Sequence, residues 1–531
     1  MYRNLFISLV LILHLTSLHA QDELWLEPIS LNTNSGLQSF AHAEFQGNFY
    51  LIGGRLDGLH QRQPFASFDN SGHNEDLWII KGDSLLEKLQ LDHLPDSLFD
   101  QLRSTNLNFY QEGNYLYLIG GYGISNPSGN HITHPYLTIL DLNQLTGLNN
   151  GDPVPSSAFQ QIEDPNFAVT GGQLRRVDTL FYLVGGHRFD GRYNPHNGPS
   201  FTQTYTNAVR RFSVSGQFPN FQVQWTTAFT DAQLLHRRDY NVAPEIKEDG
   251  SYGLVAFTGV FQTNVDLPYL NSVRIDENGA TEIPNFTQYY NHYHCANVAL
   301  FEASANRMHT LFFGGIAQYF DLNGVRTQDN DVPFVNTIAR VSRDNSGHFT
   351  EQKLNVEMPA LLGAGSEFFL AHGVPESAPG IIDYDALTGD TVLLGYIFGG
   401  IESSAPNIFF SNTGTQSSAT PRYFKVWLIK SQMNIGAIEI DGDKSQFAWQ
   451  LAPNPGGAPQ IWYAQPGPNA KMELRFRDES GKLIWSTKWI HDGSQEQQKL
   501  DPQKLKSGTY LVELHLNETI NSVQRWVYRE Y

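Results

Sequence analysis

The sequence predicts an all-β protein with two parts, a six-bladed β-propeller followed by a small β-sandwich. Three observations predict it: the composition, six copies of an apolar strand that ends in glycine, and a change of pattern after residue 440. The chain has 531 residues, of which 13% are aromatic, with 46 Gly and 26 Pro. Such a composition is typical of many short strands joined by turns. We place the propeller at 21–440, a linker at 441–452 and the sandwich at 453–531.

The first element along the chain is a signal for export. An almost unbroken apolar run from Leu5 to Leu15 follows Arg3, and the small residue Ala20 precedes a polar segment that starts at Gln21. We expect a signal peptide over residues 1–20. A retained membrane anchor is the alternative, but the run is shorter than the roughly 20 residues that a spanning helix needs. We therefore expect no transmembrane segment once the signal is cleaved.

The strand that ends in glycine defines the blades. Its apolar residues are continuous rather than alternating, which indicates a strand buried on both faces between neighbouring blades. The six copies end at Gly53-Gly54, Gly120-Gly121, Gly185-Gly186, Gly259, Gly314-Gly315 and Gly399-Gly400. A further strand follows each copy, and these strands begin near Glu75, Tyr136, Asn207, Asn271, Asn336 and Tyr423.

A third pattern precedes the glycine strands and places one polar side chain inside a short apolar segment. Its five clear copies contain His42, Asn108, Asn241, Asn297 and His372. We expect these segments to be the innermost strands, which surround the axis of the propeller. An open edge strand invites pairing with other chains, so propellers close their ring with a terminal strand. The candidate here is 25–29.

Together these patterns resemble the kelch family of repeats. In residues 40–54 the polar position His42 precedes Gly53-Gly54, as in the family's histidine-bearing strand and Gly-Gly strand, and Trp78 and Trp225 stand in later strands of their repeats. The resemblance covers the predicted propeller and implies its architecture. It implies little about function, because propellers host binding modules and enzymes alike.

The last part of the chain has a different pattern. Residues 472–477 alternate as a half-buried strand does, a turn follows at 478–482, and later strands lie at 507–514 and 524–528. With the entry at 453–455, these features resemble the C-terminal sorting domain of proteins exported by the type IX secretion system. The resemblance implies the type IX export machinery as a partner, and a secreted or outer-membrane surface protein of a bacterium. An immunoglobulin-like accessory domain is the alternative.

Charge and cysteine content exclude two further possibilities. The chain carries 35 basic and 54 acidic residues, a formal charge of −19, which repels a polyanion. We therefore expect no nucleic acid partner. Cys295 is the single cysteine, so the chain forms no intrachain disulfide.

The candidate site lies in loops that follow the glycine strands or lead into the innermost strands. A propeller places both kinds of loop on one face, and those after the glycines are long, which is common for functional loops. Guanidinium groups there can clamp an anion and aromatic rings can stack on a sugar. The ligand-binding candidates are Arg237, Arg238, Asp239, His292, His294, Arg188 and Asp190. A structural ion network of Arg237, Arg238 and Asp239 between blades is the alternative.

The same segment suggests metal chemistry only weakly. His292 and His294 are two residues apart on an apparent strand, but spacing assigns no third ligand. Cys295 beside Tyr293 resembles in outline the tyrosine–cysteine chemistry of kelch-like radical oxidases, although a buried inner-strand thiol is the simpler interpretation. We predict neither a metal nor another cofactor.

The leading functional hypothesis is recognition of an extracellular ligand, such as a glycan, a peptide or a small anion, on the long-looped face. A carbohydrate-active enzyme on that face, such as a sugar epimerase or hydrolase, is the alternative, and a structural envelope component is a third. The sequence has no nucleophile elbow, zinc-protease motif or phosphate-binding loop. Paired carboxylates leave no such motif, so a glycan hydrolase stays open.

Overall fold

The computed structural model describes residues 22–62, 66–82, 85–194, 200–322, 324–430, 449–452, 460–463, 470–478, 482–491, 497–500, 505–506, 508–517 and 519–528. The chain divides into two compact units, Met1–Gln432 and Met433–Tyr531. The prediction of an all-β chain is confirmed. Strands dominate both units, and α1 (Asp96–Leu102) is the one α-helix among the described residues.

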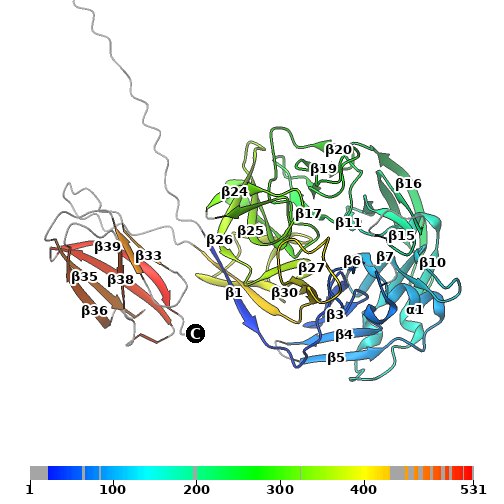
Figure 1. Ribbon diagram of the computed structural model, residues 1–531, viewed down its shortest axis with the longest axis horizontal. Helices are drawn as coiled ribbons and strands as arrows, with labels where there is room; N and C mark the ends of the chain where they lie inside the picture. The colour runs from blue at the N-terminus through cyan, green and yellow to red at the C-terminus, as the bar shows by residue number, and fades with distance from the viewer. Residues whose placement is uncertain are drawn as a thin grey trace, which may run out of the picture. The chain divides into compact units, whose positions relative to one another are not determined.

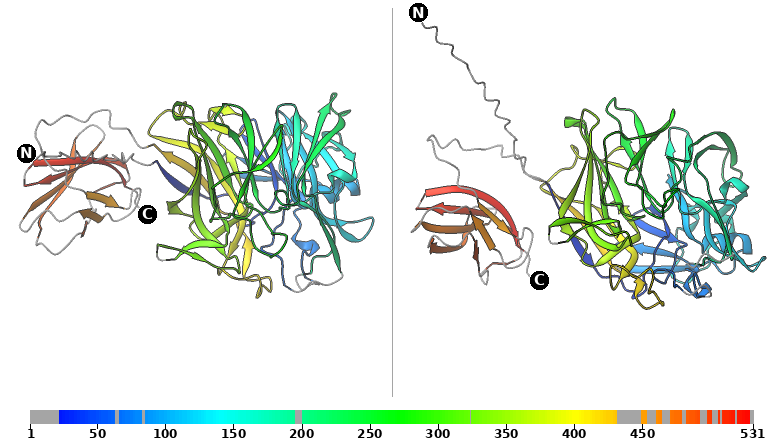
Figure 2. Two further views of the ribbon diagram at one scale, coloured as in Figure 1. Left: turned by 90° about the horizontal axis from the view of Figure 1, so that it is seen from above. Right: turned by 45° about the horizontal axis from the view of Figure 1, so that its top comes forward.

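In the first unit, six sheets lie around a common centre, as a propeller requires (Figures 1 and 2). Each has a path of four antiparallel strands. From the inner to the outer strand, the sheets are β2 (Ala41–Phe45), β3 (Asn48–Ile52), β4 (Asp76–Lys81) and β5 (Leu85–Gln90); β6 (Thr105–Glu112), β7 (Tyr115–Ser125), β9 (Tyr136–Asp141) and β10 (Phe159–Glu163); β11 (Gln173–Val177), β12 (Leu180–Val184), β15 (Ala208–Ser215) and β16 (Gln222–Thr230); β17 (Asn241–Ile246), β18 (Tyr252–Phe257), β19 (Ser272–Asp276) and β20 (Gly279–Glu282); β21 (Asn297–Glu302), β22 (Arg307–Ile316), β25 (Phe334–Arg343) and β26 (Phe349–Glu357); and β27 (Leu361–Leu370), β30 (Thr391–Ser403), β32 (Tyr423–Ile429) and β1 (Glu23–Ile29). We number these sheets one to six in this order.

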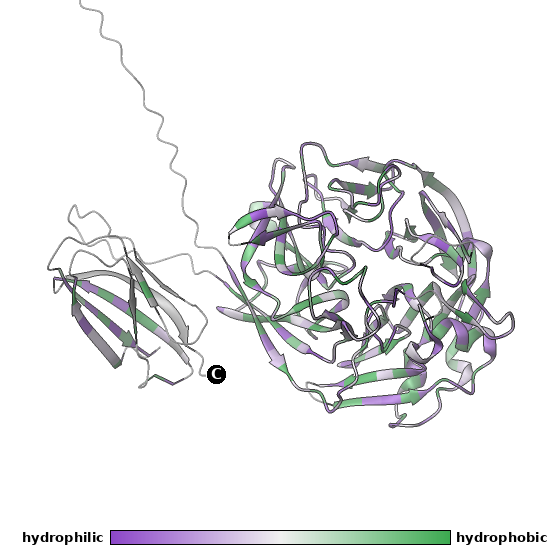
Figure 3. Cartoon of the chain, in the orientation of Figure 1, coloured by the Kyte–Doolittle hydropathy of each residue, from purple (hydrophilic) through white to green (hydrophobic). Residues whose placement is uncertain are grey.

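The hydrophobic core lies between neighbouring sheets. One cluster, for example, joins Ile52 and Ile79 of sheet one to Leu107 and Leu118 of sheet two. Hydrophobic residues therefore follow the strands throughout the unit (Figure 3). This two-sided burial is the reason that the glycine strands are continuously apolar.

The glycines that end these strands allow sheets to approach closely. Gly120 has a φ of +67°, which L side chains rarely adopt. A Cβ atom on Gly120 would lie 1.8 Å from the carbonyl oxygen of Val169 in the loop that leads into sheet three. Any other residue there would separate the two sheets.

The N-terminal strand closes the ring, as predicted. β1 pairs antiparallel with β32 from Glu23 opposite Ile429 to Ile29 opposite Tyr423. The first strand of the chain is therefore the outermost strand of sheet six, and β32 is not an open edge.

The innermost strands agree with prediction in four sheets and differ in one. His42, Asn108, Asn241 and Asn297 lie in inner strands, but His372 does not. The inner strand of sheet six is the apolar run Leu361–Leu370, which ends before His372 and contains Glu367. Sheet three has no clear copy of the pattern in the sequence, and its inner strand is β11, which starts at Gln173.

Added strands extend the loops of the first unit. Those that follow a glycine strand are β8 (Asn130–Thr133), β13 (His187–Gly191), β14 (Phe201–Tyr205), β23 (Tyr319–Leu322), β24 (Val325–Gln328) and β31 (Ser417–Ala419). The connection between β27 and β30 lies on the opposite face and is also long. It contains β28 (Glu376–Ala378) and β29 (Ile381–Asp383), of which β29 pairs with β21.

The second unit contains two sheets. One holds β33 (Trp449–Ala452), β34 (Gln460–Tyr463) and β37 (Gln497–Lys499), and the other holds β36 (Leu483–Ile490), β35 (Lys471–Arg477), β38 (Gly508–Leu516) and β39 (Thr519–Tyr528). Ile461 of the first sheet packs in one cluster with Leu474 and Val512 of the second. β33 occupies the end of the expected linker 441–452, because its backbone pairs with β34.

Two predicted segments, the signal peptide at 1–20 and the entry at 453–455, lie outside the described residues. Within the described part of the chain, no helix has the length and apolar character needed to cross a membrane.

Candidate functional site

A cavity of about 280 Å³ is lined by loops from all six sheets of the propeller. One structural position recurs in its lining. Every sheet contributes the residue that directly follows the glycine or glycine pair by which the repeats were identified. These six residues are Arg55, Tyr122, His187, Val260, Ile316 and Ile401. The cavity therefore lies on the face of the propeller that the loop pattern predicted.

A closed circle of hydrogen bonds runs through the loops that lead into the six inner strands. Five bonds join backbone amides to carbonyl oxygens of a neighbouring loop, and a threonine hydroxyl supplies the sixth. They run from Ser39 N to Gly365 O, Gly365 N to His294 O, His294 N to Asp239 O, Asp239 N to Gly171 O, Thr170 Oγ1 to Asn106 O, and Asn106 N to Ser39 O, at 2.7–3.2 Å. Six of these seven residues line the cavity. The circle thus fixes the backbone positions from which the side chains of Asp239 and His294 extend.

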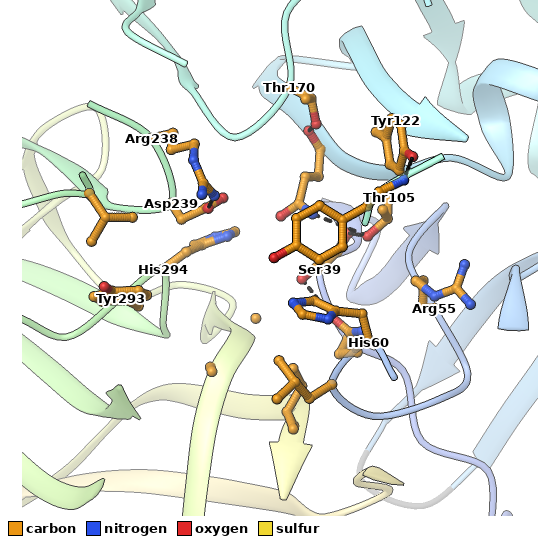
Figure 4. A pocket seen from close by; sticks show the side chains of 18 of the residues that line it. Ser39, Arg55, His60, Thr105, Tyr122, Thr170, Arg238, Asp239, Tyr293 and His294 are labelled. Atoms are coloured by element: carbon orange, nitrogen blue, oxygen red, sulfur yellow. Dashed lines mark hydrogen bonds and ion pairs between the residues drawn. The ribbon is translucent and has the colours of Figure 1, made fainter. Parts of the chain in front are cut away.

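Arg238 and Asp239 form an ion pair at this circle (Figure 4). Nη1 of Arg238 donates to Oδ2 of Asp239, and Nε donates to the Tyr205 hydroxyl at 3.1 Å. The guanidinium carbon lies 5.1 Å from the centre of the Phe261 ring. Burial lowers the pKa of Arg238, but the Asp239 carboxylate raises that pKa further, so the net shift is upward. The pair is charged and held in one geometry.

His294 lies beside the same pair and contacts a carboxylate of sheet six. Its Nε2 is 2.8 Å from Oε1 of Glu367, whose other oxygen is 3.9 Å from Nε2 of His42. Burial lowers the pKa of His294, but Glu367 raises it above the usual value. Burial lowers the pKa of His42 to about 4. The pKa values of the two imidazoles are therefore shifted in opposite directions, and Glu367 favours the protonated form of His294.

His60 and Tyr122 lie across the cavity from Arg238 and Asp239 (Figure 4). With Phe68, Phe189 and Tyr193, which contact them and also line the cavity, they form an aromatic wall. Ring centres are 4.6 Å apart for His60 and Tyr193 and 5.2 Å apart for Phe68 and Tyr122. The Tyr122 hydroxyl donates to the Gly191 carbonyl at 2.7 Å. Burial lowers the pKa of His60 to about 4, so this wall is neutral.

Three of the predicted residues, Arg238, Asp239 and His294, line the cavity together. Arg237 and His292 do not. Arg237 is 1% exposed and donates to carbonyl oxygens of neighbouring loops, for example that of Asn271 at 2.9 Å. His292 is fully buried, with Nδ1 2.7 Å from the Gly314 carbonyl oxygen. The expectation that these two side chains reach the channel mouth is therefore wrong, because both turn into the interior, where they bond backbone carbonyl oxygens.

Arg188 and Asp190 point out of the cavity, because side chains alternate along the strand β13. They form an ion pair between an exposed arginine and a half-buried aspartate, with Nε of Arg188 donating to Oδ2 of Asp190 at 2.6 Å. The cavity is lined instead by His187 and Phe189 of the same strand.

The aromatic wall and Glu367 were not predicted. Tyr122 and His187 could have been found by comparing the residues that directly follow the strand glycines in the six repeats. Phe68 and Tyr193 occupy loops that differ in length between repeats, so no alignment of the repeats reveals them. Glu367 was missed because the inner strand of sheet six was expected around His372.

The described residues contain no cluster of three or more His, Cys, Asp or Glu side chains suited to a metal ion. Cys295 is buried, and burial raises its pKa to about 12, so it is a protonated thiol.

No known family model matches the chain, and no curated protein matches it. Among solved structures, the structure of YjhT is 12% identical, with a TM-score of 0.37, over 60% of this chain and 84% of that one. A chain of RAG in complex with one melted RSS and one unmelted RSS is 12% identical, with a TM-score of 0.37, over 77% and 99%. Sucrose-6-phosphate hydrolase from Lactobacillus gasseri is 8% identical, with a TM-score of 0.29, over 96% and 88%. At these TM-scores the likenesses carry no argument about the site.

Proposed function

We propose that the protein recognises a small glycan in the cavity at the centre of the propeller. The observation that carries the proposal is the aromatic wall, which faces the Arg238–Asp239 pair across the cavity. Aromatic rings stack on the apolar faces of sugars, whereas fixed charged groups exchange hydrogen bonds with sugar hydroxyls. The hydrogen-bonded circle fixes the backbone of Asp239, and Arg238 is held by Asp239 and by the Tyr205 hydroxyl, so this pair loses little entropy on binding.

The arginines of the cavity are paired with carboxylates, which favours a neutral sugar over the small anion that the sequence also allowed. Arg238 is paired with Asp239, and Nε and Nη2 of Arg55 donate to Asp57 at 2.6 and 2.5 Å. Neither guanidinium offers the unopposed charge with which an arginine clamps an anion. A cavity of about 280 Å³ also suits a small molecule better than a peptide.

A carbohydrate-active enzyme is the second candidate, and the contact between His294 and Glu367 favours it. A histidine held by a carboxylate can move protons, as a sugar epimerase needs. A hydrolase that uses paired carboxylates is less well supported. Asp239 is the one carboxylate among the described residues that line the cavity.

We also propose that this recognition takes place outside the cell. The apolar run at 5–15 supports a signal peptide, and a second compact unit with its own core supports a separate C-terminal sorting module. The repeats of the first unit are proposed to be kelch-like. On this proposal the protein is secreted or held at the outer-membrane surface, and the type IX export machinery is its partner.

Calorimetric titration of the purified chain with a panel of mono- and disaccharides tests the recognition proposal. We expect at least one sugar to bind, and Asp239→Asn to weaken binding by about tenfold or more, because a charge-assisted hydrogen bond is lost. Asp190→Asn is the matched control, since it alters the same kind of pair outside the cavity. Sugars that bind are then followed for turnover, which the second candidate requires. If no sugar binds, the proposal is wrong.

A further inference from the structure

One repeated position of the lining changes its chemistry around the ring. Among the six residues that directly follow the glycines of the glycine strands, those of sheets one to three are Arg55, Tyr122 and His187, and those of sheets four to six are Val260, Ile316 and Ile401. Sheets four to six are consecutive in the ring, so Val260, Ile316 and Ile401 form an aliphatic wall. The loops that lead into sheets four and five bring the polar groups of Arg238, Asp239 and His294 to the same cavity.

Most of the aliphatic wall belongs to one hydrophobic cluster. Ile316, Ala364 and Ile401 line the cavity and belong to this cluster. They are 5%, 5% and 8% exposed, respectively. Leu59 and Phe409 pack against the cluster and also line the cavity. The aliphatic wall is therefore part of a packed cluster that extends beyond the residues lining the cavity.

Such a wall is a poor partner for a sugar hydroxyl. A hydroxyl that leaves water without finding a new hydrogen bond costs about 1–3 kcal/mol on the evidence of protein mutations. An apolar group placed there gains about 25 cal/mol for each Å² of apolar surface removed from water. The aromatic wall differs, because its tyrosine and histidine rings carry polar tips.

We infer that the natural ligand is an amphiphilic glycoside, a sugar that carries an apolar aryl or short alkyl substituent. The sugar lies between the aromatic wall and the Arg238–Asp239 pair, and the substituent lies against Val260, Ile316 and Ile401. The inference rests on the proposed function, since it assumes that the cavity binds a sugar, and it adds the class of sugar.

Matched pairs of methyl and phenyl glycosides of the same sugars, titrated calorimetrically into the purified chain, test this inference. We expect the phenyl member to bind about tenfold more tightly or better, because only its ring covers the aliphatic wall. Ile316→Thr and Ile401→Thr should reduce this preference to about threefold or less, because each places a hydroxyl in the wall that the phenyl ring covers. Ile408→Thr is the control, because Ile408 belongs to the same cluster but does not line the cavity.

The outcomes separate this inference from the proposed function. Equal affinity for the methyl and phenyl members of every pair that binds would overturn the inference and leave sugar recognition intact. A phenyl preference that survives both cavity substitutions would also overturn it, because the ring would then lie elsewhere. Absence of binding by both members of all pairs would contradict the proposed function itself.

Discussion

At the residue scale, adjacent arginines in one loop have opposite surroundings. Arg237 is 1% exposed and bonds carbonyl oxygens of Leu234, Thr258 and Asn271, with its guanidinium 4.2 Å from the Tyr269 ring centre. Arg238 faces the cavity and pairs with an aspartate. Arg237 thus takes part in a structural network of hydrogen bonds, whereas Arg238 lines the cavity.

Because the two arginines have different surroundings, substitution of each by methionine should affect stability and binding differently. Arg237→Met should lower the free energy of unfolding by about 2–4 kcal/mol, because buried carbonyl oxygens lose their donor. Arg238→Met should lower it by about 1 kcal/mol or less, because its ion pair is partly exposed, and should weaken sugar binding about tenfold or more. Denaturant titration and calorimetry measure the two effects. The assignment fails if Arg238→Met is the more destabilising of the two.

At the element scale, the first strand of the chain completes the last sheet. Leu24 of β1 is 6% exposed and packs in a cluster that contains residues of β21, β30 and β32. The rings of Trp25 and Trp427 are stacked with centres 6.1 Å apart, and Nε1 of Trp427 donates to Oε2 of Glu27 at 2.8 Å. Closure of the ring therefore depends on side chains as well as on the backbone ladder.

Removing the buried side chain of β1 should weaken this closure. Leu24→Ala should lower the free energy of unfolding by about 2–4 kcal/mol, because it leaves a cavity between sheets five and six. Glu23→Ala, which changes the exposed neighbour on the same strand, should change it by no more than about 0.5 kcal/mol. Chemical denaturation measures both variants. Equal stability of the two variants would contradict a closing role for β1.

At the scale of the whole molecule, the two units have separate cores. The clusters of the propeller draw on residues before 430, whereas the cluster of the second unit draws on residues between 461 and 516. All residues that line the cavity belong to the first unit. Truncation between the units should therefore separate the proposed ligand recognition from the proposed export.

A chain that ends at Gln432 tests this separation. We expect its propeller to keep its melting temperature and its affinity for sugar, because no core or cavity residue is lost. We expect it to stay inside the envelope of a bacterium with type IX secretion, where immunoblotting of the medium and of the periplasm would detect it. Release of the truncated chain into the medium would contradict the sorting role, and loss of sugar affinity would show that the second unit contributes to the site.

The predictions from the sequence were most successful where one pattern recurs. The six glycine strands, the closing strand and four of the inner strands were placed correctly, because burial between sheets imposes the same residues on every repeat. His372 was misplaced, since a polar residue beside an apolar run can lie within a strand or just beyond it. β33 was missed because its pairing with β34 is not visible in so short a segment.

The candidate site divides in the same way. The sequence by itself determined the all-β propeller, the face that carries the long loops, and a segment containing Arg238, Asp239 and His294. Only the tertiary structure decided that Arg237 and His292 are buried, that Glu367 reaches His294, and that aromatic and aliphatic side chains line one cavity. Buried strands show the same apolar pattern in every repeat, so comparison of the repeats reveals them. Which loop side chains converge depends on the positions of six sheets around one centre, and no local pattern records that arrangement.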